Sequence, residues 1–189
     1  MMIMKVLIIF AVVIGLLLLV WLGWGGYVIY STERPPYRVI RSLSANAELR
    51  QYEAQTWIAT EYGTDDDSFR VLASYIFGGN EEQRKVAMTA PVITDERMVF
   101  ILPAGIDREN APTPKGQAID FIEVPPRRLA ALSFSWTTPP DRVERKTNEL
   151  LALLEDKGVP TKGQPFLMRY NDPWTPPFMR RNEVAIEVE

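Results

Sequence analysis

The sequence contains neither cysteine nor histidine. Without cysteine there is no disulfide bond, thiolate nucleophile or zinc–thiolate site. Without histidine there is no Ser-His-Asp triad, no histidine-bound metal and no imidazole ligand for haem iron. Charges of both signs are interleaved and the net charge is only −3, so the sequence also lacks a basic stripe that follows nucleic acid phosphates. We expect no nucleic acid partner, no metal site and no catalytic constellation.

An uncharged stretch near the start of the chain, residues 6–32, is the longest apolar feature. About 20 apolar residues cross the hydrocarbon core of a bilayer, whereas the core of a cleavable signal has roughly 7–15. We therefore expect residues 1–32 to form an uncleaved membrane anchor, with a cleaved signal as the alternative, and residues 33–189 to form one soluble domain. Four aromatic residues lie where an interfacial belt would form: Trp21, Trp24, Tyr27 and Tyr30.

Two opposing features bear on the side of the membrane where the domain lies. Lys5 precedes the anchor and Arg34, Arg38 and Arg41 follow it, and this count of basic residues favours a cytoplasmic domain. The signal-like start and the lack of cysteine instead favour an exported domain. We take a periplasmic or otherwise extracytoplasmic domain as the expectation and leave the orientation open. A short proline-bearing stalk, residues 33–36, is expected to join anchor and domain.

The body repeats one order of predicted elements. Short segments rich in β-branched and aromatic residues predict strands, and a helix interrupts them in each half. The pattern predicts an α+β fold: a distorted antiparallel β-barrel or sheet from two similar halves, flanked by two α-helices and preceded by the N-terminal transmembrane helix. Strands are predicted at residues 37–43, 47–52, 55–62, 86–94, 98–102, 118–124, 129–136, 166–170 and 183–188, with a turn at 95–97.

Both predicted helices have recognisable ends. Residues 65–68 supply the cap and the first-turn acids of the first helix, which stops at Gly78-Gly79. In the second helix, Thr138 is expected to be the cap and Pro139 the first helical residue. Its apolar inner face runs over residues 143–154. The apolar positions of the first helix are Phe69, Leu72, Ala73 and Ile76.

Four blocks of residues occur in order along the body. They are Pro36-Tyr37 with Val39 and Glu48 to Tyr52; Phe69 with Leu72, Tyr75-Ile76 and Gly78-Gly79-Asn80; Met88-Thr89-Ala90-Pro91-Val92; and Pro173 to Val184, PWTPPFMRRNEV. With these blocks, residues 35–189 resemble the SOUL haem-binding protein family. The resemblance implies a distorted β-barrel with two flanking helices, similar to bacterial effector-binding domains with a duplicated half. It also implies binding of haem or a related tetrapyrrole.

Two modes of haem binding are associated with the family. One uses a histidine ligand, which this sequence does not supply. The other holds the porphyrin in a shallow apolar groove beside the first helix, with cations near the propionates. We therefore expect noncovalent binding of haem, or of another hydrophobic anionic ligand, without histidine ligation. The predicted cofactor-binding residues are Phe69, Leu72, Ile76, Lys85, Met88 and Arg180, with Arg70 and Arg181 as further candidate cations.

Several of these residues also have a purely structural interpretation. Met88 can ligate iron, but a methionine that fills the core is more common. Residues 180–183 can clamp an anion or pair internally. Residues 65–67 are better explained by helix capping than by a calcium loop, and residues 173–178 are expected to cover the core or line a groove. The lesser candidates for iron ligation are Met168, Met179, Tyr52 and Tyr75.

Two other functions stay open. A hydrolase or lyase acting on a hydrophobic substrate in the same groove would use a pair of carboxylates, for which Glu53 with Glu61 or Glu123 is a candidate. A scaffold would instead receive a helix or strand of a partner protein in the groove.

Overall fold

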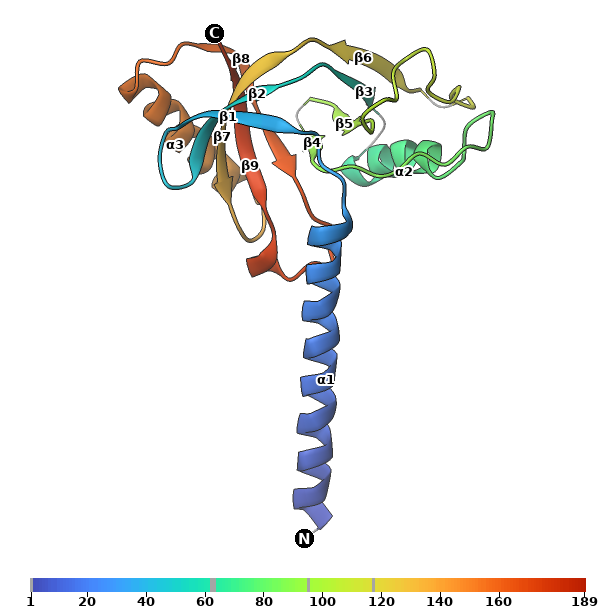
Figure 1. The fold of residues 1–189 in the computed structure, drawn as a ribbon. Helices are drawn as coiled ribbons and strands as arrows, with labels where there is room; N and C mark the ends of the chain where they lie inside the picture. Colours follow the sequence, from blue (N-terminus) through green and yellow to red (C-terminus); the bar gives the residue numbers. More distant parts are fainter. Residues whose placement is uncertain (1, 62–63, 95, 117) are drawn as a thin grey trace.

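The computed structural model describes residues 2–61, 64–94, 96–116 and 118–189. Helix α1 (Met2–Ser31) projects from a body of strands and two further helices (Figure 1). Residues Ile3–Ser31 are long and apolar enough to cross a membrane, and none of their most apolar window is buried in the protein. A membrane anchor and an N-terminal signal sequence both have these properties.

Nine strands form one antiparallel sheet in the described chain, in the order β1-β2-β7-β9-β8-β4-β5-β3-β6. The order starts at β1 and ends at β6, so the sheet is open and is not a closed barrel. The strands are β1 (Tyr37–Ser42), β2 (Ala47–Tyr52), β3 (Gln55–Thr60), β4 (Val92–Thr94), β5 (Met98–Ile101), β6 (Asp120–Val124), β7 (Arg127–Phe134), β8 (Thr161–Arg169) and β9 (Asn182–Val188).

The sheet confirms the prediction of two similar halves. In the first half, β3 is followed by helix α2 (Asp65–Ile76), β4 and β5; in the second, β7 is followed by helix α3 (Pro140–Asp156), β8 and β9. The ladder β3-β5-β4 mirrors β7-β9-β8, and the β4–β8 pair joins them at the centre. Each half also adds a strand to the sheet of the other. Strand β2, which precedes β3 in the chain, pairs with β7 of the second half, and β6, which precedes β7, pairs with β3 of the first half.

Three apolar clusters hold the body together. Helix α2 buries Leu72 and Ile76 against Phe100 of β5, and helix α3 buries Leu150 and Leu154 against β7, β8 and β9. The third cluster lies between the two halves, where the β4 and β8 strands meet, and includes Ile93 and Met168. The core therefore continues across the junction of the halves and fixes their relative position.

The two body helices begin one residue away from the predicted caps. Thr64 caps α2, and its side chain and the Asp67 carboxylate form a reciprocal capping box. In α3 the expected order is wrong by one residue, because Pro139 has an extended backbone and occupies the cap position, which leaves Pro140 as the first helical residue. Pro139 has no side-chain donor or acceptor, so this helix has no side-chain capping bond.

The prediction of a strand over residues 86–94 is wrong for its first six residues. Only Val92–Thr94 belong to the sheet, because the backbone before them bonds elsewhere. The Val86 N–H donates to the Ile76 carbonyl at the end of α2, and the Ala90 N–H donates to the Glu33 carbonyl of the stalk. Pro91 has no N–H to donate. The segment therefore ties α2 to the stalk instead of forming a ladder.

Other strand ends differ by a few residues. Strand β7 ends at Phe134 rather than residue 136, and β8 starts at Thr161, five residues before the predicted start. The predicted end of β3 at Tyr62, and Asp95 of the predicted turn, lie outside the described residues.

Candidate ligand-binding site

A groove of about 420 Å³ lies beside the N-terminal half of α2. This volume falls in the range of small-molecule pockets. Val28 near the end of α1 and Thr32 just after it form one side, and the segment after α2 and the end of β8 form the others. The groove is lined by Val28, Thr32, Asp65, Asp66, Phe69, Phe77, Met88, Thr89, Ala90, Val92, Met98, Arg169, Tyr170, Asn171, Asp172 and Pro173.

The walls of the groove are mainly apolar. Phe69 is partly exposed and its ring meets the Phe100 ring edge-on, with 5.3 Å between centroids. Phe77 is exposed just after the end of α2, and Met88 is half-buried opposite. Flat aromatic and thioether surfaces of this kind suit a planar apolar ligand.

Two residues that line the groove each have a buried side-chain nitrogen with no hydrogen-bond partner among the described residues, Nε of Arg169 and Nδ2 of Asn171. Arg169 is the last residue of β8 and Asn171 follows two positions later. A buried donor without an acceptor costs about 1–3 kcal/mol. A carboxylate on a ligand would remove this cost by accepting from both donors.

Carboxylates also lie at the rim, and their partners differ. Asp65 lies 3.7 Å from the Arg169 guanidinium, and Asp65 and Asp66 occupy the first turn of α2, where the helix dipole favours negative charge. Asp172 already accepts bonds from the Trp24 indole and from the backbone N–H groups of Trp174 and Thr175. The rim therefore suits one ligand carboxylate near Arg169 and Asn171, and disfavours a second one near α2.

A buried ionic network lies behind the Tyr170 wall of the groove. The Arg50 guanidinium makes two bonds to Glu183, of 2.7 and 3.0 Å, and these side chains are only 2% and 0% exposed. Arg181 donates to the same carboxylate at 2.6 Å, as do the hydroxyls of Ser133 and Tyr170 at 2.7 Å. All the acceptor capacity of Glu183 is used internally.

The network sets the protonation states near the groove. Burial by itself raises the pKa of the Glu183 carboxyl, but the hydrogen bonds and charge of Arg50, with the charge of Arg181, outweigh burial and lower the pKa to about 2. Burial and the Glu183 charge raise the pKa of the Tyr170 hydroxyl well above its ordinary value. Tyr170 therefore stays a neutral donor to Glu183.

The structure separates the predicted site residues into four groups. Phe69 and Met88 line the groove. Leu72 and Ile76 are buried in the core beneath α2, and the Lys85 side chain is exposed outside the groove lining. Arg180 donates to the carbonyls of Thr175 and Pro173, at 2.8 and 2.6 Å, and so fixes the preceding loop. The ligand-binding role of this set stays a prediction.

Sequence reasoning missed Arg169, Asn171, Val28 and Thr32. The x-Arg-x-Asn alternation at the end of a strand could have indicated a shared face for the first two. Val28 and Thr32 belong to the predicted anchor, residues 1–32, and nothing in the sequence indicates that the loop after β8 returns to this part of the chain.

The internal interpretation of residues 180–183 is confirmed, since Arg181 pairs with Glu183. Glu183 also accepts a hydrogen bond from Arg50, which lies 133 positions earlier in the sequence. Of the lesser candidates for iron ligation, the Tyr75 hydroxyl donates to the Pro112 carbonyl, Met168 is buried in the core and Met179 packs against Gly25. Within the described chain, no group of three acidic residues is placed to hold a metal ion.

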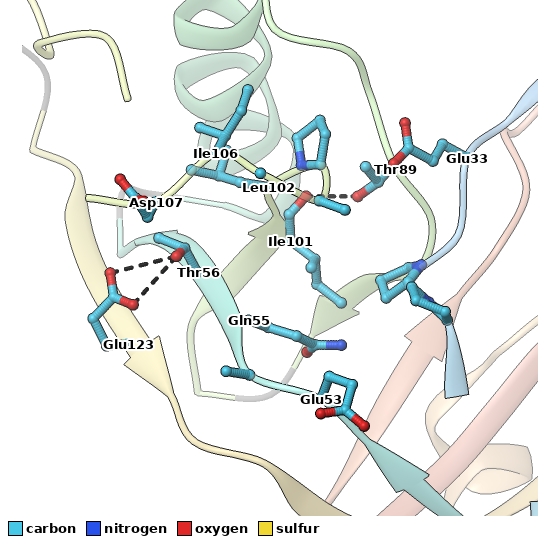
Figure 2. A pocket seen from close by; sticks show the side chains of 16 residues that line it. Glu33, Glu53, Gln55, Thr56, Thr89, Ile101, Leu102, Ile106, Asp107 and Glu123 are labelled. Carbon is cyan, nitrogen blue, oxygen red and sulfur yellow. Dashed lines mark hydrogen bonds between the residues drawn. The ribbon is translucent and has the colours of Figure 1, made fainter. Parts of the chain in front are cut away.

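A second pocket, of about 350 Å³, is lined in part by Glu33, Pro35 and Pro36 of the stalk (Figure 2). Glu53 and Glu123, one of the two predicted carboxylate pairs, both line it, and the Thr56 hydroxyl bonds to the Glu123 carboxylate at 3.3 Å. Glu33 and Asp107 line it as well (Figure 2). Glu61 lies elsewhere and pairs with Arg97 at 3.3 Å. Catalysis by the first pair, and binding of a protein partner, stay predictions.

Comparisons with known proteins agree with this architecture. The structure resembles the crystal structure of the EcmrR C-terminal domain (TM-score 0.52, 11% identity, 81% of this chain and 98% of that chain). It also resembles EcmrR in a complex with DNA (TM-score 0.55, 15% identity, 76% and 57%) and a hydrolase from Listeria innocua (TM-score 0.53, 9% identity, 85% and 94%). Identities this low show a shared fold only.

A match to a sequence family is more specific than a shared fold. Among curated proteins, none matches this chain significantly. The family described as SOUL heme-binding protein matches residues 32–187, which is nearly the whole body. With its two mirrored halves and the groove beside α2, the chain belongs to the SOUL heme-binding protein family.

Proposed function

We propose that the body, residues 33–189, binds haem or a related tetrapyrrole noncovalently in the groove beside α2, and that residues 1–32 anchor it to a membrane. The family supports tetrapyrrole binding in general. The observation that carries the specific proposal is the pair of unpartnered buried donors, Arg169 Nε and Asn171 Nδ2, on two residues that line a groove with mainly apolar walls. An amphiphile with a flat apolar body and a carboxylate matches both features.

The residues of the groove fit such a group in distinct ways. Phe69 and Phe77 offer aromatic surface to a porphyrin face, and Arg169 with Asn171 would hold one propionate. Met88 and Met98 both line the groove and offer thioethers, which are known iron ligands. Bound haem iron would supply the redox and ligand-exchange chemistry. The protein binds and orients the ring and excludes water from one of its faces.

The acidic rim makes the binding mode asymmetric. With three aspartates and one arginine around the opening, the second propionate of a porphyrin is expected to point into solvent. A tetrapyrrole with a single carboxylate is therefore expected to bind at least as tightly as a dianionic one.

Arg169→Met tests the carboxylate contact. The full-length protein in detergent is titrated with protoporphyrin IX and with its dimethyl ester, and ring fluorescence reports binding without any contribution from iron. A hydrogen bond to a charged group contributes about 1.5–3 kcal/mol, which corresponds to at least about tenfold in affinity. We expect the variant to lose about this factor for the free acid and little for the ester.

Arg70→Met is the matched control. Arg70 lies on α2, is 77% exposed and pairs with Asp67 at 3.8 Å, but it does not line the groove. Its removal changes the net charge by the same amount and is expected to leave both affinities unchanged. Equal losses in the two arginine variants would show that only overall charge matters, and the proposed carboxylate site would then be wrong.

A further inference from the structure

The loop after β8 is packed against the end of α1. The Trp21 indole donates to the Trp174 carbonyl at 2.7 Å, and the Trp24 indole donates to the Asp172 carboxylate at 3.2 Å. At Gly25, an added Cβ would approach Pro176 Cδ to 2.8 Å, so the absence of a side chain allows this close contact. The loop is therefore held in a fixed register against residues 21–25 of the helix.

Three large aromatic side chains are exposed at this end of the body. Trp174, Trp136 and Phe178 are 75%, 53% and 52% exposed, and we call them the aromatic tip. The rings of Trp136 and Phe178 lie 6.5 Å apart. Figure 1 shows the short helix η1 (Pro177–Met179) beside the upper turns of α1, at the end of the body that faces along the anchor. Exposed apolar groups gathered in this way indicate a contact surface.

The backbone holds Trp136 outward at a conformational cost. Its φ is 77°, a left-handed value that bulky residues rarely adopt. Two hydrogen bonds fix it there: its N–H donates to the Pro177 carbonyl at 2.9 Å, and its carbonyl accepts from the Asn182 side chain at 2.8 Å. Strain that is kept in place by surrounding bonds points to a use for the exposed ring.

The length of α1 gives the depth of the tip. An α-helix rises about 1.5 Å per residue, so roughly 20 residues span a hydrocarbon core of about 30 Å. Counted from the first residue after Lys5, that span ends close to Gly25. Trp21 and Trp24 then lie at the membrane–water interface, where indoles are favoured. Because Trp21 bonds directly to Trp174, the tip lies at the same depth.

We propose that the aromatic tip is a second membrane contact, inserted into the headgroup layer of the leaflet from which α1 emerges. This inference rests on the anchoring role of residues 1–32 proposed above. The bilayer is the occupant because the loop that carries Trp174 and Phe178 is bonded to the segment that is proposed to span it. The body is then held in one orientation on the bilayer surface instead of moving freely on its stalk.

This orientation places the ligand groove next to the lipid. Val28 lines the groove from α1, and Thr32 lines it from the position just after the end of this helix. They lie 7 and 11 residues after Trp21, about 10–16 Å further along the direction of the helix axis. The groove thus lies at or just above the headgroups. A ligand that partitions into the bilayer, as a tetrapyrrole does through its apolar ring, can enter the groove without crossing bulk water.

Single nitroxide labels test the proposal, and the lack of cysteine makes each introduced cysteine unique. The full-length protein is reconstituted in phosphatidylcholine bilayers with a label at Leu17→Cys, Trp174→Cys, Phe178→Cys or Thr161→Cys. Leu17 reports the anchor. Thr161 is exposed at the start of β8, where it pairs with Val188 near the C-terminus, and Figure 1 marks the C-terminus at the end of the body away from α1. Collisions with oxygen and with a water-soluble nickel chelate measure the depth of each label.

We expect the ratio of oxygen collisions to nickel collisions to be at least several times higher for the labels at 174 and 178 than for the label at 161. Nickel accessibility at 174 and 178 equal to that at 161, with position 17 inside the bilayer, would overturn the tip proposal and leave the anchor intact. Nickel accessibility at position 17 would overturn both. Protection of 174 and 178 from both reagents would indicate a protein occupant and would also overturn the proposal.

A measurement without labels guards against misfolding of the cysteine variants. In bilayers that contain brominated phosphatidylcholine, bromine quenches indoles at the membrane. Trp174→Phe keeps an aromatic ring and is expected to reduce the fraction of tryptophan emission that is quenched. Trp57 lies in β3 and gives the matched control, because Trp57→Phe is expected to raise that fraction. A quenched fraction that rises in Trp174→Phe and falls in Trp57→Phe would contradict the placement of the tip.

Discussion

Glu183→Gln removes the charge at the centre of the buried network. The folded-state pKa of this carboxyl is about 2, against an ordinary 4.5. Each pKa unit corresponds to 1.36 kcal/mol, so the difference stabilises the folded protein by about 3 kcal/mol at neutral pH. Because the folded pKa is depressed, this contribution is fully present above pH 4.5 and is lost as the pH falls toward 2.

Breaking a buried ion pair by removing one partner costs about 3–5 kcal/mol. Arg50 keeps a bond to the partly exposed Glu48 at 2.9 Å, so the lower end of that range is expected. Both lines of reasoning thus give a loss of about 3 kcal/mol at pH 7. At pH 2 the wild-type carboxyl is about half protonated in the folded protein and almost fully protonated in the unfolded chain, and the difference between the two proteins should become small.

The assay is urea unfolding of the full-length protein in detergent at pH 7 and at pH 2–3, followed by near-ultraviolet circular dichroism. Glu149→Gln is the control, because Glu149 forms an exposed pair with Lys146, and such pairs contribute about 0–1 kcal/mol. A loss below about 1 kcal/mol for Glu183→Gln at pH 7, or a loss that does not depend on pH, would refute the reasoning.

The remaining predictions concern α2 and the anchor. Thr64→Ala removes the capping box and should lower the free energy of unfolding by about 1 kcal/mol; an unchanged value would show that the box does not form. Leu72→Ala should lower the free energy of unfolding by about 2–5 kcal/mol. Phe69→Ala should lower it less and should instead weaken hemin binding. A larger loss of stability in Phe69→Ala than in Leu72→Ala would contradict the placement of these two side chains. Deleting residues 1–32 removes Val28 and Thr32 from the groove and should weaken hemin binding; equal affinity would show that the anchor is not part of the site.

Features set by local sequence were predictable. Helix α2 follows from apolar spacing between a polar cap and Gly78, and the repeated order of elements led to the two halves. The strand predicted over residues 86–94 failed because its hydrogen-bond partners lie in other elements, the end of α2 and the stalk. A pattern of β-branched residues carries no information about which backbone groups are already paired.

The site was less predictable than the fold, for the same reason. Phe69 and Met88 were found because the family resemblance directs attention to the first helix. Arg169 and Asn171 matter because one buried nitrogen of each, Nε and Nδ2, has no hydrogen-bond partner in the described chain, and burial depends on packing that no local motif specifies. Arg180 was chosen for its charge, yet its guanidinium is bonded to two loop carbonyls.

The most direct test of the central claim is a hemin titration of the full-length protein in phosphatidylcholine bilayer discs, with protein-free discs as the control and the Soret band as the readout. The groove beside α2 predicts saturable one-to-one binding, tighter than partition into the lipid and weakened by Phe69→Ala. Absorbance that rises without saturation, equally with and without the protein, would contradict tetrapyrrole binding by this groove.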